Sequence, residues 1–109
     1  LASVELAEER ERVIALLDRN RRLLTTLLAQ NVPAIRYVPP RAGYLAWLDC
    51  RALGLGDDPS RVFLERGRVA LSSGPTFGAE GKGFARLNFA TSRGLLEEAV
   101  QRIAKAVSG

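Results

Sequence analysis

The chain has 109 residues, of which 47% are hydrophobic and 26% are charged, and its formal net charge is +4. This composition is typical of a folded soluble domain and excludes a disordered chain, while the length suits one domain and is too short for most two-domain enzymes. The sequence has no histidine and a single cysteine, so we expect no transition-metal site and no internal disulfide. No apolar run approaches the roughly 20 residues of a membrane span, so we expect no membrane contact.

The first residues and the charge distribution add further expectations. The start lacks the basic end and apolar stretch of a signal peptide, and a lone cysteine suits a reducing compartment, so we expect a cytoplasmic protein. Because the sequence contains no methionine, not even at position 1, we expect it to be a piece of a longer chain. Most of the positive charge is arginine scattered beside acids, as in EERER and LERGR, which indicates a solvated surface.

A long helix is predicted over residues 4–30. Apolar residues recur there at helical spacing, including Leu6, Val13 and Leu28, and Asn31 and Pro33 end the pattern. At 1.5 Å per residue this helix is about 40 Å long, more than a compact domain of this size needs. We therefore expect its charged early turns to pack against something outside this sequence.

Two extended segments are predicted next. Residues 34–40 form a short one that Pro39 and Pro40 stop. Residues 44–50 alternate as a strand. Period-two alternation predicts one face with Tyr44, Ala46 and Leu48 and the other with Leu45 and Trp47.

The second half of the sequence is predicted to contain two helices and two strands. Asp58 is placed to cap a helix that begins at Pro59 and ends at Gly67. A third strand over 68–72 leads into a glycine-rich loop, SSGPTFGAEGKG. A fourth strand starts near Gly83, and Ser92 caps a final helix that buries Leu95, Leu96, Ala99, Val100, Ile103 and Val107. The order predicts an α+β fold with a mostly antiparallel sheet of about four strands.

The glycine-rich loop does not fit a phosphate-binding P-loop. Gly83 stands where serine or threonine should follow Lys82, and Thr76 stands where the first glycine belongs. The loop also connects two strands, so no helix N-terminus stands behind it to hold a phosphate. We interpret it as a tight, mobile connection.

Other candidate reactive residues have plain structural interpretations. Ser72 and Ser73 have no histidine to activate them. Cys50 is interpreted as a small buried residue without a basic neighbour. We interpret the nearby aspartates as residues of a strand end and a helix cap, and not as paired catalytic acids. They are Asp49, Asp57 and Asp58.

Arg86 is the exception. In GFARLNFATSR, Ala85, Leu87 and Phe89 share a core face, and Arg86 lies on the opposite face with Phe84, Asn88 and Ala90. An arginine in such an apolar strand is costly unless an anion pairs with it, and its planar fork suits a carboxylate. The sequence leaves two interpretations equally open: a small acidic ligand, or an internal ion pair or exposed sheet face.

Three stretches together resemble a known family: PPRAGYLAWLDCRALGL, VFLERGRVALSSGPTFGAEGKGFARLNFATSR and LLEEAVQRIAKAV. They resemble the C-terminal, small domain of fold-type I pyridoxal phosphate (PLP) enzymes, in the cystathionine β-lyase-like branch of the class I/II aminotransferases. The resemblance covers nearly the whole chain. It implies a long interdomain-type helix over 1–30, an α+β small domain over 31–109, and a homodimeric parent enzyme whose large PLP-binding domain lies outside this sequence.

The resemblance also implies roles for individual residues. Arg86 occupies the position of the arginine that binds the α-carboxylate of the amino-acid substrate, and Asn88 and Tyr44 match family positions that line the site or are structural. The family's Schiff-base lysine is not matched, because Lys82 and Lys105 stand in other contexts. We therefore expect a carboxylate clamp, no catalytic or cofactor-binding residue in this segment, and no activity of the segment alone.

Two alternatives remain at this stage. A free-standing basic α+β module could bind RNA, since Trp47, Phe84 and Tyr44 supply some aromatic residues, although the expected RNA-binding signature is missing. A free-standing domain descended from the enzyme could instead bind a small acidic ligand. Within the enzyme interpretation, the sequence does not separate an aminotransferase from a carbon–sulfur lyase.

Overall fold

The structure is a computed structural model that describes the backbone of residues 2–38 and 43–108, and the side chains within 4–37 and 43–108. It has an α+β fold, as predicted. Pro39 and Pro40, predicted to stop the first extended segment, lie outside the described residues. The elements are α1 (Ala2–Asn31), β1 (Arg36–Val38), β2 (Leu45–Asp49), η1 (Arg51–Leu53), α2 (Pro59–Gly67), β3 (Ser72–Ser73), η2 (Gly74–Phe77), η3 (Ala79–Gly81), β4 (Phe84–Asn88) and α3 (Arg93–Ser108), where η marks a 3₁₀ helix.

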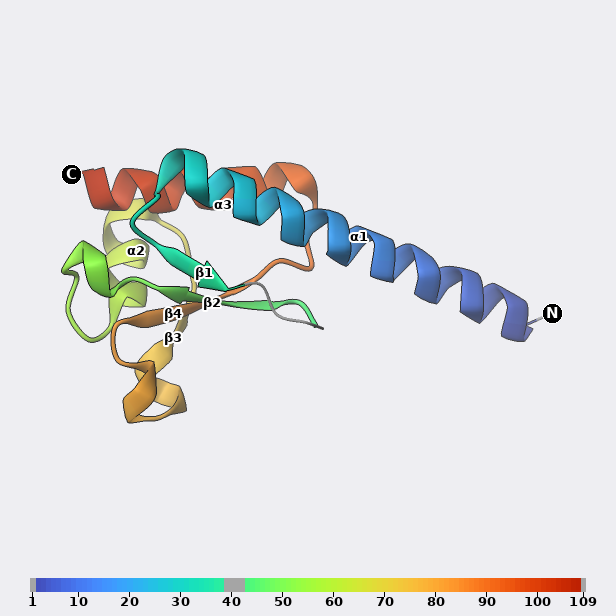
Figure 1. Cartoon of the computed structure of the whole chain (residues 1–109), viewed down its shortest axis with the longest axis horizontal. Helices are drawn as coiled ribbons and strands as arrows, with labels where there is room; N and C mark the ends of the chain where they lie inside the picture. Colours follow the sequence, from blue (N-terminus) through green and yellow to red (C-terminus); the bar gives the residue numbers. More distant parts are fainter. Residues whose placement is uncertain (1, 39–42, 109) are drawn as a thin grey trace.

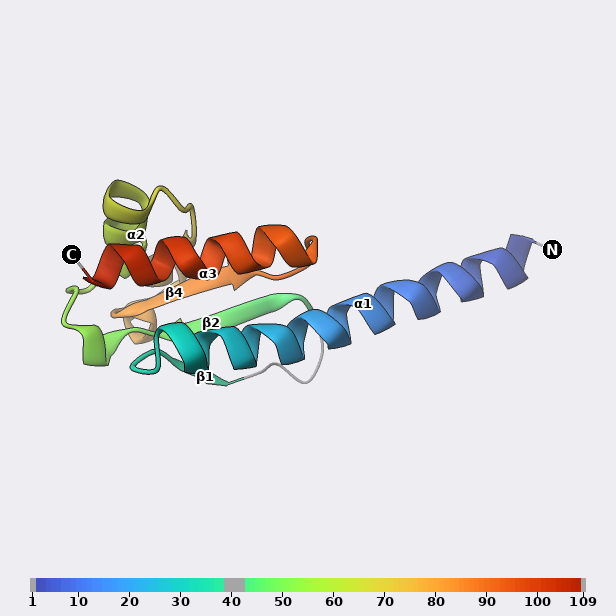
Figure 2. The same ribbon diagram turned by 90° about the horizontal axis from the view of Figure 1, so that it is seen from above.

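The four strands form one antiparallel sheet in the order β1-β2-β4-β3. Helices α1 and α3 lie side by side across one face of this sheet (Figures 1 and 2). Helix α2 packs on α3, and Gly67 permits the contact because a Cβ there would lie 2.4 Å from the Arg102 carbonyl oxygen. The short helices η2 and η3 lie on the opposite side of the sheet, drawn in gold in Figure 1.

The hydrophobic core lies between the sheet and the two long helices. Strand alternation buries Ala46, Leu48, Ala85 and Leu87 toward the helices, as predicted. Helix α3 contributes a stripe at helical spacing, but Leu95 was wrongly assigned to it and is 59% exposed. The helical core residues are Leu24, Leu28, Phe63, Leu96, Val100, Ile103 and Ala106.

Helix α1 extends well beyond the sheet (Figure 1). Every residue from 4 to 15 is exposed, including Leu6 and Val13 from the apolar pattern of the sequence. Only its second half reaches the core, and it ends at Asn31 as predicted. No helix within the described part of the chain combines the length and the apolar character needed to cross a membrane.

Two strand predictions need correction. The third strand is Ser72–Ser73 and not 68–72, because Arg68 adopts a left-handed conformation (φ 57°) and the Val69 amide donates to the Phe63 carbonyl of α2. Tyr44 does not share the buried face of Ala46 and Leu48. It precedes the first residue of β2, and its side chain is 47% exposed.

A buried asparagine joins α1 to the end of β4. Asn20 has no exposed surface, and its Nδ2 donates to the carbonyl oxygens of Phe89 (2.8 Å) and Thr91 (2.7 Å). Because these acceptors immediately follow β4, Asn20 fixes the exit of the strand against the long helix. Sequence reasoning missed this residue, although a polar side chain among the apolar positions of α1 was a usable signal.

The glycine-rich loop is ordered into η2 and η3, which press against each other. A Cβ on Gly74 would lie 2.2 Å from the carbonyl oxygens of Gly81 and Phe84, and a Cβ on Gly81 would lie 1.9 Å from that of Gly74. Glycine is therefore required at both positions by close backbone approach. The loop packs the backbone of η2 directly onto the start of β4.

Candidate functional site

The candidate site lies on the sheet face that α1 and α3 leave uncovered. Arg86, in the middle of β4, pairs in register with Trp47 of β2 on one side and with Ser72 of β3 on the other. Period-two alternation directs Arg86 away from the core because its neighbours Ala85 and Leu87 point into it. Strand β4 thus presents one guanidinium at the centre of the open face.

Arg86 has no carboxylate partner among residues 4–37 and 43–108. Its side chain is partly buried, and its Nε atom is buried without a hydrogen-bond acceptor. The guanidinium carbon instead lies over the ring of Phe77, 4.1 Å from the ring centroid. The ion-pair interpretation of Arg86 therefore finds no partner within these residues, and its two Nη groups, which are not buried, remain available to an anion.

The ring over this guanidinium belongs to a small aromatic cluster. Trp47 contacts the rings of Phe77 and Phe84 edge-on, with centroid separations of 5.6 and 6.0 Å. Beside them a cavity of about 260 Å³ is lined by Trp47, Phe77, Glu80, Gly81 and Phe84. Phe77 was not predicted as a site residue, although a lone aromatic residue in a glycine-rich loop was a signal for it.

The two further candidate residues, Asn88 and Tyr44, lie near each other, where the end of β4 meets the start of β2. Asn88 ends β4 and pairs in register with Leu45, which follows Tyr44. The Asn88 Oδ1 accepts the Ala90 amide at 2.8 Å, so part of this side chain closes the turn after β4. The Tyr44 carbonyl accepts the Phe89 amide at 2.8 Å, while the Tyr44 side chain is exposed. Both residues have visible structural roles, and neither contacts Arg86 through a hydrogen bond.

Cys50 and Asp49 have the structural environments that were predicted, whereas the predicted helix cap at Asp58 is wrong. Cys50 is buried, and this burial raises the pKa of its thiol to about 12. Asp49 ends β2 and accepts two hydrogen bonds from the Arg51 guanidinium (2.9 and 2.8 Å), which lowers the pKa of that carboxyl. Asp58 precedes α2, but its carboxylate accepts from the Ser60 hydroxyl and does not cap the helix amides. None of these groups is arranged as a nucleophile or an acid–base pair.

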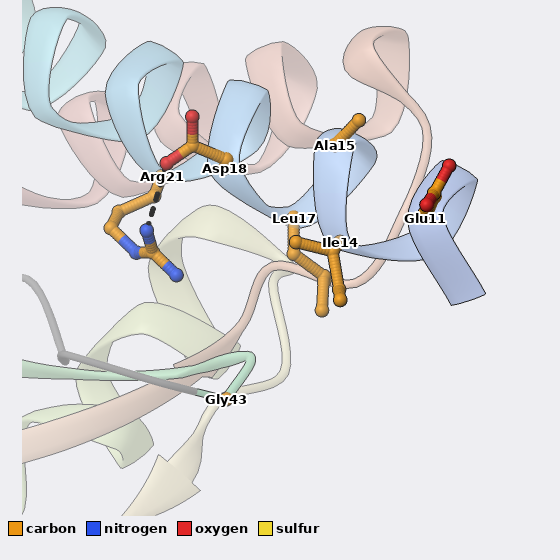
Figure 3. Close-up of a pocket in the computed structure, with 7 residues that line it drawn as sticks. All are labelled: Glu11, Ile14, Ala15, Leu17, Asp18, Arg21 and Gly43. Carbon is orange, nitrogen blue, oxygen red and sulfur yellow. Dashed lines mark hydrogen bonds and ion pairs between the residues drawn. The ribbon is translucent and has the colours of Figure 1, made fainter. Parts of the chain in front are cut away.

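A larger groove of about 540 Å³ lies elsewhere, between α1 and the start of β2 (Figure 3). Its cation already has a carboxylate partner, because Arg21 Nη1 donates to Asp18 Oδ1 at 3.0 Å, although Asp18 also pairs with Arg22 and the buried Arg21 Nε has no acceptor. Most of its exposed wall is apolar, including Ile14 and Leu17, and no sequence-predicted site residue lines it. Volume alone favours this groove, but the unpaired cation favours the face around Arg86.

Comparisons with known proteins identify relatives of the chain. No protein-family model matches it. A Mycobacterium tuberculosis protein assigned as a cystathionine beta-lyase is 44% identical over an alignment of 108 positions, which covers 84% of this chain and 26% of that protein. An aspartate aminotransferase of Pyrococcus horikoshii is 32% identical over 90 residues, which span 82% of this chain and 23% of that enzyme.

A solved structure agrees with these sequence relatives. Cystalysin from Treponema denticola, which contains a pyridoxal 5'-phosphate cofactor, superimposes with a TM-score of 0.88 at 27% identity. The match covers 95% of this chain and 27% of cystalysin. The chain thus spans about a quarter of the length of the proteins it matches. The chain is thus homologous to one domain-sized part of PLP-dependent cystathionine β-lyases and aminotransferases.

Proposed function

We propose that this chain is the substrate-carboxylate-binding part of a PLP-dependent enzyme that cleaves a carbon–sulfur bond or transfers an amino group. Arg86 binds the α-carboxylate of the amino-acid substrate. The observation that carries the proposal is the state of this side chain. It is a partly buried guanidinium with an unpaired, buried Nε and no carboxylate partner among the described residues.

The chemistry of the guanidinium supports this role. Its planar fork matches a carboxylate held by two parallel hydrogen bonds, and such charge-assisted bonds are stronger than neutral ones. The Nε of Arg86 is buried, so a carboxylate binds through the two Nη groups, which make no hydrogen bond to the described residues. Because β4 lies between β2 and β3, the backbone of Arg86 is fixed on both sides. The carboxylate, and with it the α-carbon, is then held in one orientation.

The described residues do not form a site for PLP itself. Lys82 and Lys105 are the only lysines of the sequence, and both are exposed, one beside η3 and the other on α3. The glycine-rich loop leads into β4 and not into a helix N-terminus, so it offers no phosphate cradle. The cofactor is held by a separate large domain, and the chain alone is inactive.

The proposed domain arrangement follows from the helix that extends beyond the core. Residues 1–30 serve as an interdomain helix and residues 31–109 as the small domain. The exposure of every residue from 4 to 15 supports this assignment, because those turns add no core to the small domain. The assembled enzyme is a homodimer, as the family resemblance implies.

The RNA-binding alternative is weaker than the carboxylate-binding proposal. RNA-binding sheets offer free aromatic faces to bases. Here one face of Phe77 is covered by Arg86 and one face of Phe84 by Arg51, at 4.1 and 5.1 Å from the ring centroids. Arg51, the cation beside Phe84, is paired with the Asp49 carboxylate at 2.8 Å, which reduces its attraction for phosphate. Titration of the chain with single-stranded RNA at physiological salt is expected to show no saturable binding.

Substitution of Arg86 in the full-length enzyme tests the proposal. Arg86→Lys keeps the charge but loses the two-pronged geometry. Loss of one charge-assisted hydrogen bond costs about 1.5–3 kcal/mol, or roughly ten- to a hundredfold in kcat/KM for an amino-acid substrate such as L-cystathionine. Arg86→Ala is expected to cost more. Arg61→Lys, on the exposed surface of α2, is the matched control and should leave kcat/KM within about twofold of the wild type.

Thermal melts and cofactor absorbance separate a binding role from a structural one. A binding role predicts normal PLP occupancy and a normal Tm in the Arg86 variants, together with the loss in kcat/KM. A lowered Tm with nearly normal kinetics of the folded enzyme would assign Arg86 to structure and refute the proposal.

A further inference from the structure

We infer that Phe77 is a positioning residue for Arg86: its ring holds the guanidinium in the orientation that receives the substrate carboxylate. The inference rests on the proposed role of Arg86 and adds the element that sets its geometry. Phe77 lies nine residues before Arg86 in the sequence, on η2 and outside the sheet. It acts on substrate only through the arginine.

A ring is suited to this task because it attracts the cation without consuming its donors. The face of an aromatic ring carries partial negative charge, and a guanidinium within about 6 Å of the centroid is attracted to it. The Arg86 guanidinium carbon is 4.1 Å from the Phe77 centroid. A carboxylate at the position of Phe77 would also hold the guanidinium, but it would occupy the N–H groups that the substrate needs. Phe77 therefore restrains Arg86 and leaves its binding capacity free.

The ring is itself held by a rigid support. Helix η2 contains Pro75 near its start, and Thr76 Oγ1 donates to the Ser73 carbonyl at 2.6 Å. The close approach of Gly74 to Gly81 and to the Phe84 carbonyl fixes η2 against the first residue of β4. The glycine-rich loop thus connects the Phe77 backbone to the strand that carries Arg86. This gives the loop a specific purpose: it places an aromatic ring beside the guanidinium.

Trp47 completes the support from the side. It is the register partner of Arg86 on β2, and it contacts Phe77 edge-on at 5.6 Å with an interplanar angle of 82°. An edge-to-face contact of this kind is favourable and restricts the tilt of the ring. Phe84 contacts the same indole at 6.0 Å but has Arg51 over its own ring. Phe84 therefore provides an internal comparison for Phe77.

The geometry can be tested on the chain itself by NMR. Protons above an aromatic ring are shielded, so the Arg86 Nε–H resonance should lie upfield of those of exposed arginines. Phe77→Leu should move the Arg86 Nε–H resonance to the position of exposed arginines, and Phe77→Tyr should leave it upfield. Phe84→Leu should change the Nε–H resonance of Arg51 but not that of Arg86. An Arg86 resonance that does not respond to Phe77→Leu in a folded chain would overturn the inference.

The functional consequence is tested in the full-length enzyme. Loss of the ring should lower kcat/KM for the amino acid about three- to thirtyfold, as expected from the strength of a cation–π contact. It should lower kcat/KM less than threefold for the corresponding amine, which lacks the α-carboxylate. Phe77→Tyr should restore kcat/KM for the amino acid to within about threefold of the wild type. An equal loss for both substrates, or no rescue by tyrosine, would assign Phe77 to structure alone.

The Arg86 variants separate this inference from the function on which it rests. If Arg86→Lys impairs amino-acid turnover and Phe77→Leu does not, the carboxylate site stands and the positioning role fails. If neither variant impairs turnover, the proposed function fails as well. Loss of activity in both variants, with rescue by Phe77→Tyr, supports both.

Discussion

Replacing Asn20 by alanine is expected to destabilise the fold strongly, because two carbonyl groups lose their donor. The Phe89 carbonyl lies in the buried part of this contact, and a buried acceptor left without a partner costs about 1–3 kcal/mol. The Thr91 carbonyl is only partly buried and can accept a hydrogen bond from water instead, so loss of the Asn20 hydrogen bond there costs about 0.5–1.5 kcal/mol. The expected loss in the free energy of unfolding is therefore about 2–4 kcal/mol.

Urea denaturation followed by fluorescence measures this loss, since Trp47 is the only tryptophan. Thr25→Ala, at an exposed position on the same helix, is the matched control and should change the free energy of unfolding by less than about 0.5 kcal/mol. Asn20→Asp has nearly the same shape but places acceptors opposite two carbonyl oxygens, so it should be at least as damaging as alanine. An Asn20→Ala chain as stable as Thr25→Ala would refute the assigned role of this contact.

Two other perturbations follow from the fold. Gly74→Ala would push apart the backbones of η2 and η3 and should lower the free energy of unfolding, measured by urea denaturation, by about 1–3 kcal/mol. Gly94→Ala is the control: a Cβ there meets open space, so the variant should raise the free energy of unfolding by about 0.4–1 kcal/mol. Equal effects of the two substitutions would contradict the close packing of the loop. Burial raises the pKa of the Cys50 thiol to about 12, so the native chain should resist iodoacetamide at pH 8. Because the unfolded thiol titrates near about 8.5, the free energy of unfolding should fall as the pH rises from about 9 towards 12, and a Cys50→Ala chain should lack this part of the decline.

Elements with clear periodicity could be predicted from the sequence, and segments governed by tertiary contacts could not. The alternation in GFARLNF correctly separated the core face of Ala85 and Leu87 from the face of Arg86. Residues 68–71 have the composition of a strand. The left-handed turn at Arg68 and the hydrogen bond from the Val69 amide to the Phe63 carbonyl instead hold the start of this segment against the end of α2. Tyr44 departed from its predicted face because β2 starts one residue later.

The candidate site shows the same division. Arg86 was found because a charge in an apolar strand is visible in the sequence, and the family resemblance then gave it a role. Phe77 is a visible lone aromatic residue in the glycine-rich loop, but its position over Arg86 was missed because it depends on how η2 folds back on β4. Asn20 was missed for a related reason: its partners are backbone carbonyls some 70 residues away, at separations of 69 and 71.

The proposed recognition of a carboxylate by Arg86 is tested most directly by the dependence of turnover on the substrate's α-carboxylate. In the full-length enzyme, kcat/KM should be compared for an amino acid and for the matching amine without the α-carboxylate, in the wild type and in Arg86→Ala. The substitution should lower kcat/KM at least tenfold for the amino acid and leave kcat/KM for the amine nearly unchanged, so that the preference for the carboxylate is lost. A preference that survives in a folded, PLP-loaded Arg86→Ala enzyme would show that Arg86 does not bind the carboxylate.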